Sequence, residues 1–257
     1  MPAPARANAS GSLELAHARL CARFGERADE AVWRRIEVVR DVAGVLDIVR
    51  ASSLAPYVTG IGPEIEAHAL ETAARRHWRA LVHEVAGWMP PPWQPAVRWC
   101  AVLVDLPALA ALGRREPLPA WLADDPLLRG LAGSEQALVD RDCSALLRAG
   151  GGDAARLQAA WRAQWLARLP EPLPAHPLLQ RLVHMLDEHA HRFARAHPAD
   201  AWPLRRGLAA RVILLFRRAG DDPAQAFAFL TLAALDYERL RGELVPRALF
   251  PQRTLAA

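Results

Sequence analysis

Three side chains in the last third of the chain have types and a spacing that could bind a metal ion. His184, Glu188 and His191 stand at i, i+4 and i+7, so a helix would place all three on one face. Metal sites in helical bundles use glutamate and histidine at such spacing, but they draw further ligands from other helices. The obvious further ligands here are the imidazoles of His68, His77 and His83. The competing interpretation is that apolar residues form the buried face of this helix and the histidines point outward, and the sequence favours it.

Other catalytic chemistry has even less support in the sequence. All 32 basic residues are arginine, which excludes a Schiff base, a phosphate-loop lysine and a kinase-type lysine. The chain also lacks a nucleophile elbow, a HExxH zinc motif and a glycine-rich phosphate loop. We therefore predict no catalytic residue, no bound metal and no cofactor.

Charge and cysteine content narrow the class of partner. The net charge is +4 and the pI is about 9.6, but the arginines are dispersed among acidic residues. Doublets such as Arg75-Arg76 fall on amphipathic helices, where the sequence predicts a solvated, salt-bridged face instead of a nucleic-acid site. Cys21, Cys100 and Cys143 are too widely spaced for a zinc knuckle or a disulfide framework. These features predict a cytoplasmic protein whose partners are not nucleic acids.

The chain shows no sign of export or of a membrane span by uninterrupted apolar length. Its start, MPAPARANASGS, lacks the apolar region of a signal peptide, and residues 1–12 are predicted to be a disordered tail. The longest apolar runs, RVILLF and AFAFLTLAAL, are far shorter than the ~20 residues needed to cross a bilayer. We expect a protein that is soluble, or peripheral on the inner face of a membrane.

Apolar residues recur with the period of an α-helix almost throughout, so the fold class predicted is all-α with about ten helices. Residues 13–257 would form a single helical domain, broken by proline-rich stretches near 90–95, 113–126 and 170–177. The helices expected span residues 13–24, 29–51, 63–88, 95–112, 134–148, 153–169, 177–196, 199–219 and 223–244. Nine tryptophans, five of them near the first proline-rich break, could serve either the core or an interface.

The last helix changes character within one turn. Residues 226–235 are apolar on every face, so other helices must enclose them. The residues that follow carry charges that we expect to reach water or a partner, and pairs at i, i+3 such as Asp236 with Arg239 would add a few tenths of a kcal/mol each. Asp236, Arg239 and Arg241 are the predicted interface residues.

This last helix resembles a known family. Ala228-Phe229-Leu230, then Asp236, then Leu240-Arg241, are similar to the closing helix of the C/d-subunit family of V-type and A-type ATPases. His17-Ala18-Arg19-Leu20 resembles the family's opening helix. The chain departs from the family pattern at Ala233-Ala234, where the family carries Lys-Glu, and at Arg239, where it carries Asn.

The resemblance implies a funnel-shaped protein of three similar helix groups, compatible with the proline-rich breaks. Such a protein is a non-catalytic peripheral subunit that sits on the membrane rotor ring and forms a socket for the central stalk. Its partners would be other protein subunits of the rotary ATPase, and ion transport would be its context. Two alternatives stay open: a soluble cytoplasmic helical adaptor or assembly factor, and a metal-dependent helical enzyme that uses His184, Glu188 and His191.

Overall fold

The computed structural model describes residues 4–64, 67–123, 125, 128 and 141–250, and these contain helices and no strand, which confirms the all-α prediction. The α-helices are α1 (Pro4–Gly25), α2 (Glu30–Val38), α3 (Val42–Arg50), α4 (Ala67–Trp88), α5 (Gln94–Trp99), α6 (Leu106–Gly113), α7 (Ala120–Ala123), α9 (Arg141–Gly150), α10 (Ala154–Leu166), α11 (Pro177–Phe193), α12 (Ala201–Ala219) and α13 (Ala224–Leu249). Short 3-10 helices are η1 (Ala55–Val58), η2 (Cys100–Asp105), η3 (Leu173–Ala175) and η4 (Pro198–Asp200).

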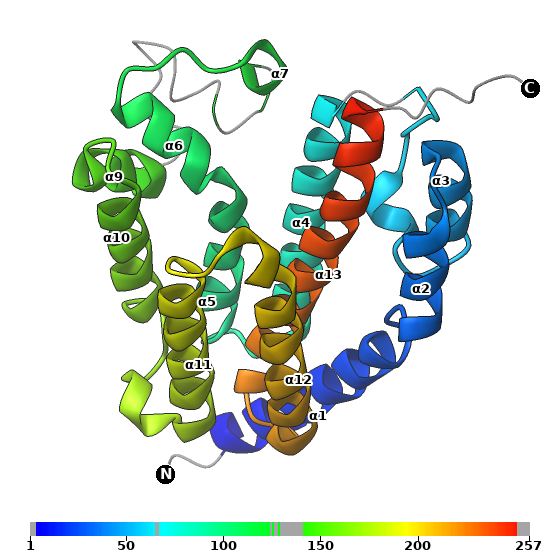
Figure 1. The fold of residues 1–257 in the computed structure, drawn as a ribbon. Helices are drawn as coiled ribbons and strands as arrows, with labels where there is room; N and C mark the ends of the chain where they lie inside the picture. The colour runs from blue at the N-terminus through cyan, green and yellow to red at the C-terminus, as the bar shows by residue number, and fades with distance from the viewer. Residues whose placement is uncertain (1–3, 65–66, 124, 126–127, 129–140, 251–257) are drawn as a thin grey trace, which may run out of the picture.

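Two long helices, α4 and α13, pack against each other through the middle of the molecule (Figure 1). On one side of them stand α6, α9 and α10, and on the other side stand α2 and α3 (Figure 1). The helices α11 and α12 lie in front, and α1 runs beneath α4 and α13. The walls spread apart toward the top of this view, so the backbone forms an open V (Figure 1).

The apolar side chains form two clusters, and α4 and α13 contribute to both. The larger cluster joins α4 and the first half of α13 to α1, α5, α6 and α9–α12. The smaller cluster holds α2, α3 and η1 against the start of α4 and the end of α13, where Leu70, Leu240 and Leu244 are buried. Each fully buried leucine stabilises the fold by about 1.5–3 kcal/mol relative to an exposed one, so these two helices tie the whole chain together.

The predicted enclosure of the last helix is confirmed. Every residue from Ala224 to Leu230 is buried, as are Leu232 and Ala233. The Asp222 carboxylate accepts a hydrogen bond from the amide of Ala224 at 2.7 Å, so it satisfies a free amide of the first turn. Packing on all sides is consistent with the composition of this stretch, whose polar side chains are Gln225 and Thr231 alone; the Thr231 hydroxyl donates a 2.8 Å hydrogen bond to the carbonyl of Phe227.

Several helix boundaries differ from the prediction. The single helix expected over residues 29–51 is two helices, because Val39 is extended and Asp41 starts a new helix by accepting a 2.7 Å hydrogen bond from Gly44. The structure continues α1 back to Pro4, into the segment predicted to be a disordered tail. The helix expected over residues 134–148 falls partly on residues 129–140, outside the described part, and α9 covers the remainder.

The run Gln94–Gly113, which comprises α5, η2 and α6, is the one described segment long and apolar enough to cross a membrane, with a mean hydropathy of 1.6. Half of its most apolar window is buried inside the protein, and Val97 and Leu109 are fully enclosed in the larger cluster. Pro107 occupies the first turn of α6, a position that proline tolerates because that amide has no helical partner. About half of the apolar segment Gln94–Gly113 is therefore accounted for by packing in the core.

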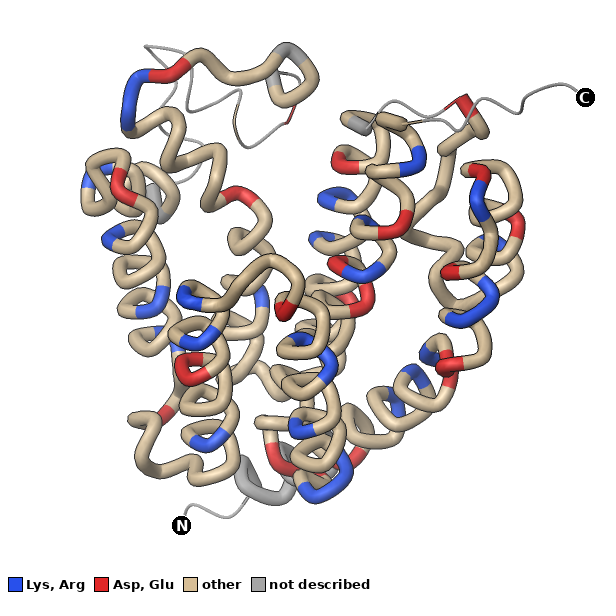
Figure 2. The backbone as a smooth tube through the Cα atoms, in the orientation of Figure 1, with Lys and Arg blue, Asp and Glu red and all other residues tan. Residues whose placement is uncertain are grey.

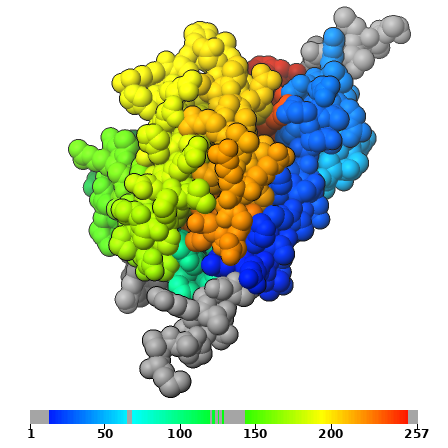
Figure 3. Space-filling model, turned by 90° about the horizontal axis from the view of Figure 1, so that it is seen from below, coloured from blue at the N-terminus to red at the C-terminus, as the bar shows by residue number. Residues whose placement is uncertain are grey.

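Charged residues are spread over every described helix except α6 and α7, and acidic and basic residues occur together on most of them, although α5, α10 and α12 carry arginine alone (Figure 2). Seen from below, α11 and α12 lie side by side at the surface, with α1 next to α12 (Figure 3). The dispersal agrees with the expectation of solvated, salt-bridged helix faces, and the ion pairs include contacts at i, i+3 and i, i+4.

Candidate functional site

Two cavities lie along the packed pair α4 and α13, and we call them together the central hollow. The outer cavity, of about 660 Å³, is walled by α4, η2, α6, α7 and α13. The inner cavity, of about 350 Å³, is walled by α4, η2, α10, α11 and α13. Trp78, Leu103 and Ala234 line both, so the two spaces share part of their wall. A hollow of this kind could receive a ligand or part of another protein.

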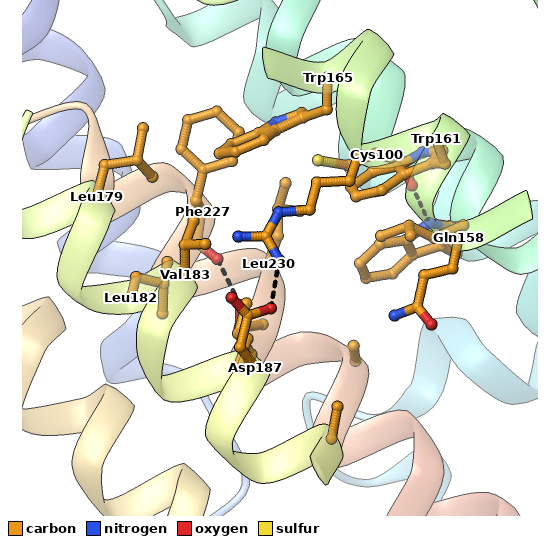
Figure 4. Close-up of a pocket in the computed structure, with 17 residues that line it drawn as sticks. Cys100, Gln158, Trp161, Trp165, Leu179, Leu182, Val183, Asp187, Phe227 and Leu230 are labelled. Atoms are coloured by element: carbon orange, nitrogen blue, oxygen red, sulfur yellow. Dashed lines mark hydrogen bonds and ion pairs between the residues drawn. The ribbon is translucent and has the colours of Figure 1, made fainter. Parts of the chain in front are cut away.

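Apolar and aromatic side chains line the inner cavity (Figure 4). Trp165 on α10 meets Phe227 on α13 edge to face, with 5.4 Å between the ring centres. The indole of Trp78 donates a 3.0 Å hydrogen bond to the carbonyl of Cys100, which fixes the ring in the wall. Burial raises the pKa of the Cys100 thiol to about 12, so at neutral pH this thiol stays protonated and is a poor nucleophile. The inner cavity is therefore suited to binding an apolar group and not to catalysis by this thiol.

A single ion pair crosses from α10 to α11 at this cavity. Arg162 donates to the carboxylate of Asp187 at 2.5 Å (Figure 4). The two side chains are 40% and 51% exposed, so the pair contributes at most about 1 kcal/mol to stability. An entering group could displace it at small cost.

Glu71 organises the polar wall of the outer cavity. The hydroxyl of Tyr237 donates to its carboxylate at 2.8 Å, and Arg241 forms an ion pair with the same carboxylate. Burial, and then the negative charge of Glu71, raises the pKa of Tyr237, so the phenol stays a neutral donor. Nearby, His68 and Trp121 stack with 5.3 Å between ring centres.

Two arginines of α4 and two aspartates form a second polar cluster behind this wall. Asp105, at the end of η2, is 1% exposed and accepts from both Arg75 and Arg79, the latter at 2.6 Å. Arg79 also pairs with Asp125 at 2.9 Å. Burial raises the pKa of Asp105 while the two guanidinium groups act to lower it. The cluster therefore serves as a tie between α4, η2 and the α7 region, since its charged groups hold one another.

Sequence reasoning missed this cluster. Arg75 belongs to a doublet interpreted as a solvated face, but it is only 8% exposed, so that interpretation is wrong for Arg75. Its neighbour Arg76 is exposed, as predicted. No local signal separates the two, because the partner Asp105 lies 30 residues further along the chain.

The predicted interface residues of the last helix lie on two different sides of it. Asp236 forms a double hydrogen bond with Arg27, both distances being 2.8 Å. Arg239 is 7% exposed, pairs with two glutamates of α2, and lies over the rings of Trp33 and Trp202. The expectation that these two charges reach water is wrong. They hold the turn between α1 and α2, and α2 itself, against α13, whereas Arg241 is 46% exposed and lines the outer cavity.

The predicted metal-binding face carries ion pairs. Glu188 contacts Arg211 at 2.6 Å and Arg192 at 3.8 Å, while His184 and His191 are exposed. Among the residues that the structure describes, no group of three His, Cys, Asp or Glu side chains is arranged to hold a metal ion. Of the further histidines expected to help, His68 stacks on Trp121 and His77 meets the ring of Tyr57 edge to face.

Most of the tryptophans near the first proline-rich break serve the core. Trp78, Trp93 and Trp99 are buried in the larger apolar cluster, and Trp88 and Trp121 are partly buried against it.

Comparison of the chain with models of protein families, with curated proteins and with solved structures gives no match.

Proposed function

We propose that this protein is a non-catalytic docking subunit of a rotary ATPase of the V or A type. It would sit peripherally on the cytoplasmic side of the membrane rotor ring and use its central hollow as a socket for a helical end of the central stalk. The observation that carries the proposal is the central hollow itself. It is large, it is lined mainly by apolar side chains, and its buried charges already hold one another.

Three features support this proposal over an enzymatic one. The Cys100 thiol in the wall has a raised pKa, the buried carboxylate Asp105 is held by two arginines, and Tyr237 is held as a neutral donor. At neutral pH the Cys100 thiol and the Tyr237 phenol stay protonated, and Asp105 is 1% exposed and held by arginines, so none of the three is suited to act as a base on a substrate. We choose a rotary ATPase as the complex because the first and last helices resemble those of the C/d-subunit family.

A cavity-filling variant tests the socket. Ala234 lines both cavities, so Ala234→Phe would place a ring in the shared wall and obstruct an incoming helix. Ala80 on α4 is exposed and lines neither cavity, so Ala80→Phe is the matched control. Each tagged protein would be purified from native membranes in mild detergent, and the proteins that accompany it would be identified.

We expect stalk and rotor-ring subunits to accompany the wild type and the Ala80→Phe control, and to be lost with Ala234→Phe. Circular dichroism must show that Ala234→Phe keeps its helix content. Recovery of the wild type from the soluble fraction alone, with no subunit of a membrane complex enriched, would refute the proposal. A soluble helical adaptor would then be the better account.

A further inference from the structure

A separate groove, of about 280 Å³, lies between α11 and α12, outside the central hollow. The two helices follow each other in the chain and pack side by side at the surface (Figure 3). Its floor is apolar: Met185 of α11 and Leu215 of α12 are buried, and Leu178 is partly buried. Leu214 lines the same groove and is 54% exposed, so it adds accessible apolar surface next to this floor.

The rim of the groove is positively charged on both walls. Arg181 and His184 stand one turn apart on α11, and Arg211 and Arg218 stand two turns apart on α12. Arg211 pairs with the carboxylate of Glu188. Among the described residues no carboxylate lies within 4.0 Å of the guanidinium groups of Arg181 or Arg218. Two exposed arginines therefore face each other across an apolar floor.

We propose that this groove binds an amphipathic helix of a partner protein, with apolar residues on its inner face and acidic residues on both flanks. Two neighbouring helices leave a channel into which a third can lay its apolar stripe. From Arg211 to Arg218 the rim extends over two helical turns, about 10 Å, so it fits an elongated ligand. Carboxylates on the flanks of that helix would pair with Arg181 on one wall and Arg218 on the other.

The shape of the groove favours a helix over a membrane surface. Leu215 is 4% exposed and Met185 is 6% exposed, so the apolar floor lies below the charged rim. A flat lipid surface would meet the arginines but would not reach this floor. A helix can do both, because its side chains project several ångströms from its backbone. The groove is distinct from the socket proposed above, and its occupancy does not depend on that function.

A designed peptide tests the inference directly. The probe is a fluorescent helical peptide of about 18 residues, with leucine at i, i+3, i+4 and i+7 and glutamate on both flanks. The control peptide has the same leucines and arginine in place of each glutamate. Binding of both to the intact purified protein would be measured by fluorescence anisotropy at low and at moderate salt. We expect the acidic peptide to bind at least about tenfold more tightly than the basic one.

Charge reversal locates the site. Arg181→Glu with Arg218→Glu should weaken binding of the acidic peptide at least about tenfold, since two attractive pairs become repulsive. Arg35→Glu with Arg156→Glu, on exposed positions of α2 and α10, makes the same change in net charge and should alter the affinity less than about twofold. Leu214→Glu should weaken binding as much as the double reversal, because it places a charge on the apolar part of the groove. If the double variant loses its helix content, Arg218→Gln replaces it.

Three results would overturn the inference. The acidic peptide could bind no better than the basic one, or the control reversal could weaken binding as much as the groove reversal. The third is that vesicles rich in phosphatidylglycerol bind the wild type in a manner lost on groove reversal, while the acidic peptide does not bind. The groove would then be a site for anionic lipid.

Discussion

Removal of one partner from the buried pair of Arg27 and Asp236 should be one of the most destabilising single polar replacements in this protein. The pair joins the residues just after α1 to the centre of α13, 209 positions away, through two hydrogen bonds of 2.8 Å. The side chains are 17% and 13% exposed, so neither charge is well solvated. Burial raises the pKa of Asp236 although Arg27 acts to lower it, which means that desolvation outweighs the attraction for the ionised carboxyl.

The perturbation is Asp236→Ala, and we expect it to cost about 3 kcal/mol in the free energy of unfolding. Breaking one side of a buried pair leaves an uncompensated charge, which typically costs 3–5 kcal/mol. We take the lower end because Arg27 keeps some contact with water. For a chain of this size each kcal/mol lowers the melting temperature by about 2–4 °C, so a fall of about 6–12 °C follows. Thermal unfolding followed by circular dichroism measures it.

Two further variants make the reasoning refutable. Asp47 pairs with Arg50 on the surface, with the carboxylate side chain 78% exposed, so Asp47→Ala should cost less than about 1 kcal/mol. The double replacement Arg27→Met with Asp236→Leu should recover much of the loss, since it removes both charges together. Two results would show that the pair is not a coupled buried pair. Asp236→Ala could unfold at the same temperature as Asp47→Ala. Alternatively, the double replacement could lose as much stability as the single replacements Arg27→Met and Asp236→Leu added together.

Three other predictions follow from the described contacts. Leu230→Asp should unfold or aggregate the protein, because Leu230 is 3% exposed and a buried unpaired carboxylate costs several kcal/mol; Leu249→Asp, at a position 58% exposed, is the control, and an unchanged melting temperature for Leu230→Asp would refute the prediction. Burial lowers the pKa of His77 below its ordinary 6.5, so its contribution to stability is present above pH 6.5 and lost on acidification; the melting temperature of His77→Gln should fall less than that of the wild type between about pH 7.5 and about pH 5, and equal falls would contradict this. The purified protein should hold no stoichiometric zinc, iron or manganese; elemental analysis that finds about one metal per chain, lost on His184→Ala or His191→Ala, would support the metal-enzyme alternative instead.

The helical architecture was predictable because its signal is local. Apolar residues at the helical period, with prolines at the breaks, are enough to place α4, α10, α11, α12 and α13 within a few residues of their ends. The one helix predicted over residues 29–51 failed because Asp41, which leaves the helical apolar stripe uninterrupted, caps a new helix. An aspartate on the polar side of such a stripe can equally well be a solvated residue, and the sequence does not distinguish the two.

The central hollow was not predictable in the same way, since it depends on contacts between distant segments. The pairs that hold its walls join Arg79 to Asp105 and Glu71 to Tyr237, which are separated by 26 and 166 positions. A sequence pattern reports which face of a helix is apolar, but not whether the neighbouring helices close completely over that face. Trp78 and Leu103 therefore look like ordinary core residues in the sequence, although they border two cavities.

The geometry of α13 decides where a docking partner could touch this helix. Ala234, Tyr237, Arg241 and Val245 stand at i, i+3, i+7 and i+11, so they form one stripe, and all of them line the outer cavity. Asp236 and Arg239 lie on a different face, where Arg27 and the glutamates of α2 hold them. Replacing Asp236, Arg239 and Arg241 together would therefore damage folding before it reported on docking. A partner in the central hollow would contact the stripe from Ala234 to Val245, which includes Arg241. Substitutions confined to that stripe should weaken binding of the partner without breaking the ion pairs that hold Asp236 and Arg239.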